Sequence, residues 1–265
     1  MASSGRTSSL HTRLHTSAAR FVATRWSVVL AAAGRGGTGG GEAASTASSR
    51  RALEELCRAY WFPLYAFVRR KGNGPAEAED LTQGFFTHLL ENAGLTSVDR
   101  SRGRFRTFLL AAFTNFVADQ RDKTRAVKRG GGRRVFSLDG LSRDGASAEA
   151  QYAKALSDTM TPERLFERSW AITVLSQVVQ RLKQEYADRG KSDVFDALRH
   201  SLDGQTAQRS HAEIGLALGM SAGAVDVQAH RLRRRYRDLL RAEILQTVDG
   251  DELVDEEIRY LLRCL

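Results

Sequence analysis

The segment from His211 to Leu240 constrains the fold more than any other part of the chain. Ser210 and Glu213 have the spacing of a capping box, which predicts that a short helix begins here. Gly219 can adopt the positive φ that ends such a helix, and Ser221 is suited to cap a second one. The segment therefore predicts two helices joined by a sharp turn.

The second of these helices is predicted to be amphipathic. Its inner face carries apolar residues at spacings of three and four, namely Val225, Ala229, Leu232, Tyr236 and Leu239. Gly215, Gly219 and Val225 have the spacing of a helix-turn-helix motif, and Gly215 falls where two helices are expected to cross closely. We therefore predict a helix-turn-helix, with an ordinary helical hairpin as the alternative.

The outer face of the second helix predicts contacts with duplex DNA. Early residues of such a helix enter the major groove, where Gln, Arg and Asp side chains pair with base edges, and later arginines meet phosphates. The predicted duplex contacts are Ser221, Asp226, Val227, Gln228, His230, Arg231, Arg234 and Arg235. A basic face that is merely solvated is the alternative.

The overall charge agrees with a polyanionic partner. The net charge is +9 and the isoelectric point is about 10.0, and each phosphate neutralised by Lys or Arg releases a counterion. Composition alone does not separate DNA, RNA and an anionic membrane. Cys57 and Cys264 lack the spacing of a metal site, so we expect no metal, no cofactor and a reducing cytoplasm. The longest apolar runs are too short to cross a bilayer, so we expect no membrane span.

The remaining sequence predicts helices throughout, because no long stretch alternates as a strand does. A first helix over residues 49–70 would bury Leu53, Leu56, Tyr60, Leu64 and Phe67. A second would begin at Pro75 and bury Leu81, Phe85 and Leu89, and a third would start near Phe105. Thr161 and Pro162 predict another helix start, followed by a stripe of Leu165, Ile172, Leu175 and Val179. The predicted fold class is all-α.

Composition divides the predicted helices into two small domains joined by a flexible linker. The predicted segments are a disordered basic arm with room for one short helix (1–47), a first helical domain (48–130), a linker with a short helix near Glu149–Leu156 (131–160), a helix-turn-helix domain (161–246) and an acidic tail (247–265). Residues 1–41 contain no acid, so an organelle transit peptide is the alternative for the arm.

A second basic region lies between Arg100 and Arg134, which contains eleven basic residues and only two acids. Phe105, Phe108, Phe113 and Phe116 are interleaved with this charge. Basic residues beside aromatic rings suit single-stranded nucleic acid, whose unstacked bases lie on ring faces. The alternative is that these phenylalanines form core, as Phe at helical spacing usually does.

Three stretches carry a family resemblance. They are "AEAEDLTQGFFTHLL", "FRTFLLAAFTNFVADQRDKTR" and "HAEIGLALGMSAGAVDVQAHRLRRRYRDLL", and together they resemble the two-domain extracytoplasmic-function sigma factors of RNA polymerase. The runs "TRWSVVLAA", "LCRAYWFPLYAFVRRKG" and "TPERLFERSWA" are similar to the planctomycete-type branch. The resemblance extends from Thr24 to Val248 in family order.

The resemblance implies that the two domains bind different partners and promoter elements. A sigma-2 helical bundle would dock on the β′ clamp helices through Glu79, Asp80, Gln83 and Phe86. The same bundle would melt and read the −10 region through Phe105, Arg106, Asn115, Asp119, Arg121, Lys123 and Arg125. A sigma-4 domain, associated with the β flap, would read the −35 element with the duplex contacts named above. Gly84 stands where the family usually has an acid, and Asp226 where it often has a basic residue.

These expectations describe a bacterial, cytoplasmic sigma factor that binds core RNA polymerase and promoter DNA. It would not be an enzyme, would be a monomer outside the holoenzyme, and would be open to an anti-sigma or kinase regulator. A stand-alone helix-turn-helix regulator and an enzyme acting on nucleic acid are the alternatives. For the tail, Leu253, Ile258, Leu261 and Leu262 could form one helical face packed on the last domain. Alternatively, its acids could cover a basic DNA-reading surface or receive a regulator.

Overall fold

The computed structural model describes residues 42–91, 104–127, 145–156, 159–202, 209–248 and 250–265. Every regular element within these ranges is a helix, so the predicted all-α class is confirmed. The elements are α2 (Glu42–Arg70), α3 (Pro75–Glu91), α4 (Phe105–Val127), α5 (Gly145–Ala155), α6 (Pro162–Ala187), α7 (Ser192–Leu198), η3 (Arg199–Leu202), α8 (His211–Leu218), α9 (Ala222–Leu245), η4 (Asp251–Leu253) and α10 (Val254–Arg263). The predicted basic arm lies mostly outside the described residues.

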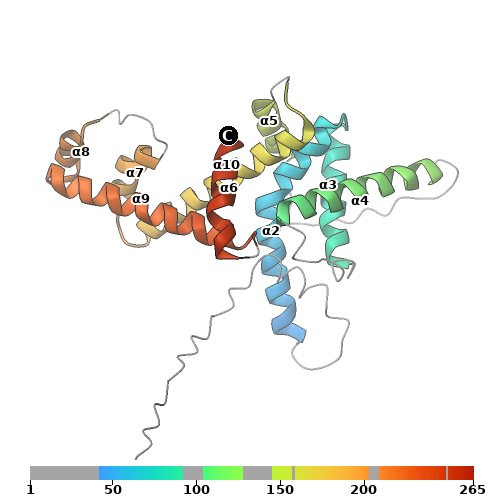
Figure 1. Ribbon diagram of the computed structural model, residues 1–265, viewed down its shortest axis with the longest axis horizontal. Coiled ribbons are helices and arrows are strands. Elements are labelled where there is room, and N and C mark those ends of the chain that lie inside the picture. Colours follow the sequence, from blue (N-terminus) through green and yellow to red (C-terminus); the bar gives the residue numbers. More distant parts are fainter. Residues whose placement is uncertain (1–41, 92–103, 128–144, 157–158, 203–208, 249) are drawn as a thin grey trace, which may run out of the picture.

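The helices are arranged around a central pair, in which α6 packs along α2. Figure 1 shows α3 and α4 at one end of the molecule and α7, α8 and α9 at the other. Between them lie α6 and the C-terminal helix α10, which packs on both α9 and α6. The elements expected to touch nucleic acid therefore lie at opposite ends.

Helix α2 is buried on nearly all sides over its second half. Leu56, Tyr60, Leu64 and Phe67 face the core as predicted, but their neighbours from Ala59 to Val68 are buried as well. A helix that is apolar all round belongs in the centre of a fold, where partners cover every face. Here α3, α5 and α6 supply those partners.

Helix starts follow the local signals. Pro75 begins α3, and the Thr161 hydroxyl caps α6 by accepting a hydrogen bond from the Arg164 amide at 3.3 Å. Proline at the first helical position has no amide hydrogen to leave unpaired, and its fixed φ suits the helix. Both predicted starts are confirmed.

The predicted buried stripe of α6 is wrong in part. Ile172 is 40% exposed, and Leu175 and Val179 are half-buried. The buried row instead runs at intervals of four through Phe166, Trp170, Val174 and Val178. Two apolar stripes compete on this helix, and the one with the tryptophan and phenylalanine is buried, because large aromatic side chains have the most apolar surface to remove from water.

Part of the predicted linker is a packed helix. Helix α5 begins at Gly145, four residues before the predicted start, and buries Ala148 and Tyr152. The Glu149 carboxylate accepts hydrogen bonds from Tyr65 at 2.6 Å and from Arg69 at 2.9 and 2.6 Å. These contacts fasten α5 to α2. The buried residues of both predicted domains form one continuous cluster, so the division into two domains joined by a linker stays a prediction.

The tail forms the helix α10, whose predicted inward face is confirmed for Leu261 and, half-buried, for Ile258, and is wrong for the other two leucines. Val254, Glu257 and Leu261 are buried, whereas Leu253 and Leu262 are 40% and 54% exposed. A glutamate therefore occupies the middle of the buried face. Its partners are Arg104 and Arg106 at the start of α4, well over a hundred residues earlier in the sequence.

Candidate nucleic-acid interface

Helices α8 and α9 form the turn that the local sequence predicts. The Ser210 hydroxyl accepts a hydrogen bond from the Glu213 amide at 3.3 Å, and the Glu213 carboxylate accepts one from the Ser210 amide at 2.7 Å. The hydrogen bond from the Ser210 amide, followed by one from the Ser210 hydroxyl, lowers the pKa of Glu213 from its usual range. Gly219 ends α8 with a φ of 65°, and the Ser221 hydroxyl caps α9 by accepting from the Ala224 amide at 3.2 Å. The capping box, the glycine and the second cap are all confirmed.

Gly215 is required by a close backbone approach. A Cβ at this position would lie 2.6 Å from the Met220 carbonyl oxygen, well inside van der Waals contact. The Met220 amide in turn donates to the Gly215 carbonyl at 2.8 Å. The nearest neighbour is therefore the backbone of the turn, and the next is the start of α9, whose Ala222 nitrogen lies 3.5 Å from the same Cβ position.

The outer face of α9 carries the predicted duplex contacts. Val225, Ala229, Leu232 and Leu239 are buried and Tyr236 is half-buried, as expected of the inner face. The opposite face exposes Val227, His230, Arg231 and Arg234. Gln228 is half-buried at the edge of this face. The exposed face therefore combines one apolar side chain with an imidazole and two arginines.

Asp226 is also exposed, but its carboxylate already has a partner. Its Oδ1 contacts Nδ1 of His211, the first residue of α8. The contact joins the two helices of the motif and draws the acid toward α8. A base that hydrogen-bonded Asp226 would have to compete with this imidazole.

Arg235 is not part of the free face, which corrects the sequence expectation. Its guanidinium binds the Glu185 carboxylate of α6 through two hydrogen bonds, both of 2.7 Å. This bonding lowers the pKa of Glu185 from its usual range. The side chain that was expected to meet a phosphate instead fastens α9 to α6.

The sequence analysis did not predict a second cationic surface, which lies beside the outer face of α9. Arg233, Tyr236 and Arg237 line a hollow of about 390 Å³ together with His230, Ser201 and Leu202. The signal was available, because His230, Arg233 and Arg237 have the spacing of one helical face. An anionic group such as a phosphate fits the charge of this hollow.

Helix α4 carries a row of exposed polar residues. Asn115 and Asp119 are one turn apart, and Lys123 follows at the same spacing. Arg121 is exposed too and donates to the Asn73 side-chain oxygen at 2.9 Å. The Asn73 amide donates to the Val68 carbonyl, so Arg121 rests on a fixed loop between α2 and α3. The side chain of Arg125 lies outside the described residues.

Phe105 and Arg106 are buried, which corrects their expected role as surface contacts. Phe105 is fully buried, and its ring meets that of Tyr60 edge-on with centroids 5.5 Å apart. Arg106 is 3% exposed and contacts Glu257 of α10. Tertiary contacts with α2 and α10 therefore remove both side chains from solvent in this arrangement.

The other phenylalanines of α4 favour the core alternative. Phe113 and Phe116 are buried against Phe85 of α3, with ring centroids 5.0 and 5.7 Å apart, and Phe108 is half-buried. Aromatic pairs at these separations stabilise a core beyond their buried area. They hold α4 on α3 and leave its polar row outward.

The face of α3 expected to dock on polymerase is partly accessible. Asp80 is exposed, whereas Glu79 and Gln83 are half-buried and joined by a hydrogen bond of 3.3 Å. Phe86 is 1% exposed and packs on Phe85, so its expected role as a surface contact is corrected. Gly84 faces α4, where a Cβ would lie 3.4 Å from the Phe116 ring.

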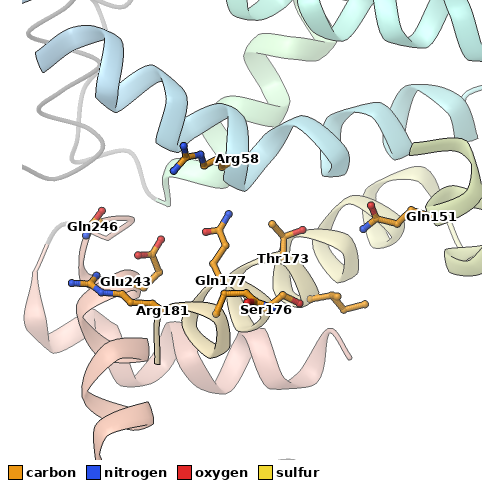
Figure 2. Close-up of a pocket in the computed structure, with 10 residues that line it drawn as sticks. Arg58, Gln151, Thr173, Ser176, Gln177, Arg181, Glu243 and Gln246 are labelled. Carbon is orange, nitrogen blue, oxygen red and sulfur yellow. The ribbon is translucent and has the colours of Figure 1, made fainter. Parts of the chain in front are cut away.

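One cavity lies among α2, α5, α6 and the end of α9. It measures about 450 Å³ and is lined mainly by polar side chains of these helices, with Arg58 and Gln177 facing across it (Figure 2). Arg58, Arg181 and Glu243 are its charged residues. Within the described residues, no three His, Cys, Asp or Glu side chains gather as a metal site would require.

Comparison with known proteins adds no relative. No family model, no curated protein and no solved structure matches the chain. Of the helices that the structure describes, none combines the length and the apolar character needed to cross a membrane. The candidate interface thus depends on the residues themselves.

Proposed function

We propose that the protein is a sigma factor, which binds core RNA polymerase and directs promoter recognition, promoter melting and initiation. The supporting observation is that one chain presents two unlike polar surfaces, on helices that extend toward opposite ends of the fold (Figure 1). One is the outer face of α9 in a helix-turn-helix, and the other is the polar row of α4. Initiation needs both kinds of surface, because one promoter element is held as duplex while another is opened.

Helix α9 would read duplex DNA at the −35 element. Val227, His230 and Arg231 are exposed near its start, where a recognition helix meets base edges. An apolar side chain can contact a thymine methyl, and an arginine can bind guanine through two hydrogen bonds. Arg234, and the hollow lined by Arg233 and Arg237, would hold backbone phosphates.

Helix α4 would act on the opened strand at the −10 element. The Asn115 amide has the donors and acceptor to bond an extruded base. Arg121 and Lys123 lie about two turns further along. They would neutralise the strand's phosphates. The exposed acid Asp80 and its neighbours on α3 would dock on a basic surface of the polymerase. A protein with this role works in the bacterial cytoplasm.

In-vitro transcription with bacterial core polymerase tests the proposal. On a library of upstream regions, adding the protein should create new start sites that core polymerase alone does not use. Arg231→Ala should abolish most of this initiation, because one arginine bound to guanine contributes about 1–3 kcal/mol of discrimination. Arg164→Ala is the matched control, since Arg164 is an exposed arginine at the start of α6 and is not among the proposed DNA contacts.

The rival functions give different results in the same assays. A stand-alone regulator would bind a specific duplex tightly without polymerase, whereas a sigma factor should bind weakly until core polymerase is added. An enzyme acting on nucleic acid would convert the DNA without initiating transcripts. If core polymerase neither associates with the protein nor starts at new sites, the proposal is wrong.

A further inference from the structure

The start of α4 is enclosed by parts of the chain that follow it by well over a hundred residues. The Phe105 amide donates to the Thr247 carbonyl, just beyond α9, at 3.2 Å. Arg104 binds Glu256 and Glu257 of α10 at 2.5 and 2.8 Å. The first turn of α4 is thus tied to the C-terminal segment through backbone and side chains together.

Arg106 lies at the centre of this contact. Its guanidinium meets the Glu257 carboxylate, and the two side chains are only 4% and 1% exposed. It also lies over the rings of Tyr260 and Trp170, 4.2 and 5.0 Å from their centroids. Cation–π contacts of this kind strengthen when water is excluded.

Helix α10 is held over this arginine by a further contact. The Tyr260 hydroxyl donates to Glu167 of α6 at 2.5 Å, which fixes the ring that covers Arg106. Val254 and Leu261 bury the flanking positions of α10 against the core. Carboxylates, rings and apolar side chains together close off the start of α4.

The ion pair between Arg106 and Glu257 gains little net stability from being buried. Burying two charges removes their hydration, and this loss offsets much of their attraction. Although the two groups are in ionic contact, neither oxygen of Glu257 makes a well-formed hydrogen bond. The ion pair therefore specifies where α10 sits more than it adds to stability. A ligand that bound Arg104 and Arg106 through its own anionic groups would compete with the same carboxylates.

We propose that α10 is an intramolecular mask, in which Glu256 and Glu257 occupy the cationic start of α4 that otherwise binds nucleic-acid phosphates. The inference rests on the proposed function, since it assigns regulation to the predicted single-strand surface. Displacing α10 uncovers Arg104 and Arg106. Bound nucleic acid and docked α10 are mutually exclusive states, so each lowers the affinity for the other by the same factor.

The full-length chain allows a direct test with a fluorescein-labelled single-stranded DNA 20-mer. Glu257→Gln keeps the shape of the side chain but removes its charge, and it should raise affinity in fluorescence anisotropy by roughly five- to a hundredfold, the usual range of such coupling. Asp255→Asn is the matched control. It changes the charge of the same helix equally, but Asp255 contacts Arg241 of α9 and not α4. Its affinity should stay near that of the wild type.

Hydrogen exchange of the unmodified protein gives an independent readout. Saturation with the 20-mer should speed amide exchange in α10 over residues 254–263, because binding displaces that helix. This measurement needs no variant and so does not depend on whether Glu257→Gln folds. Amide exchange in α10 that stays unchanged at saturation overturns the mask. The mask is also overturned if the wild type and a folded Glu257→Gln variant bind the 20-mer with equal affinity, or if neither of them binds it.

Failure of the mask and failure of the proposed function are separable. If the wild type supports initiation by core polymerase but α10 stays protected when DNA binds, the sigma function stands and the mask falls. If the oligonucleotide results are as expected but core polymerase ignores the protein, the mask stands and the sigma function falls.

Discussion

Single glycines and arginines decide the geometry of the helix-turn-helix. Gly215 has no room for a side chain, because the Met220 carbonyl lies where a Cβ would be. Arg235, three helical positions from a buried leucine, is taken up by Glu185. Neither role concerns contact with a ligand, yet both set where the exposed face of α9 points.

Gly215→Ala should destabilise the protein by about 1–3 kcal/mol, since the turn must move to admit the methyl group. Urea denaturation followed by circular dichroism would measure the loss. Gly223→Ala is the control, because nothing lies within 4 Å of a Cβ there and alanine favours the helix by up to about 1 kcal/mol. A stable Gly215→Ala variant would contradict the close approach.

Arg235→Ala should lower the free energy of unfolding by about 1 kcal/mol, because it breaks a pair with two hydrogen bonds that is still partly exposed to solvent. Its effect on DNA affinity should be smaller than that of Arg231→Ala, whose side chain is exposed. Urea denaturation and DNA-binding isotherms of the two variants would separate these roles. Equal losses of DNA affinity in the two variants would indicate that Arg235 contacts DNA.

At the scale of elements, polar networks attach one helix to another. Glu149 attaches α5 to α2, and its pKa is lowered, first by the hydrogen bond from Arg69 and then by that from Tyr65. A carboxyl with a lowered folded-state pKa contributes stability that is present above its unfolded value of about 4.3. That contribution is lost as the pH falls through the folded-state pKa.

Glu149→Gln should therefore destabilise the protein at pH 7, by about 1–2 kcal/mol for a charged hydrogen-bond network that is partly exposed. The difference from the wild type should shrink below about pH 4, where the wild-type carboxyl becomes protonated. Urea denaturation from pH 3 to pH 7 would measure it. Asp196→Asn, an exposed acid of α7, should show little pH-dependent difference.

Element starts were predictable because each depends on a few adjacent residues. Thr161 with Pro162, Ser210 with Glu213, and Ser221 all cap the helices that the sequence places there. Inward faces were less predictable. On α6 and α10 two registers compete, and the choice depends on partners elsewhere in the chain.

At the scale of the whole molecule, α2 and α6 share one core although they belong to different predicted domains. Trp170 of α6 is fully buried in that core. Separate domains would unfold independently, whereas a shared core couples them.

Heating should therefore produce one cooperative transition, with a calorimetric enthalpy equal to the van't Hoff enthalpy. Differential scanning calorimetry of the full-length chain would check this. Two resolved transitions would instead support the predicted domain division and weaken the role of the α2–α6 contact.

The sequence by itself determined the all-α class, the caps and turn of the helix-turn-helix, and the exposed row of α4. These features depend on local backbone preferences and on helical periodicity, which nearby residues specify. Only the tertiary structure decided that Phe105, Arg106 and Phe86 are buried, that Arg235 binds Glu185, and that Glu257 faces α4. A side chain's exposure depends on which distant element packs over it, and neither charge nor spacing along one helix specifies that partner.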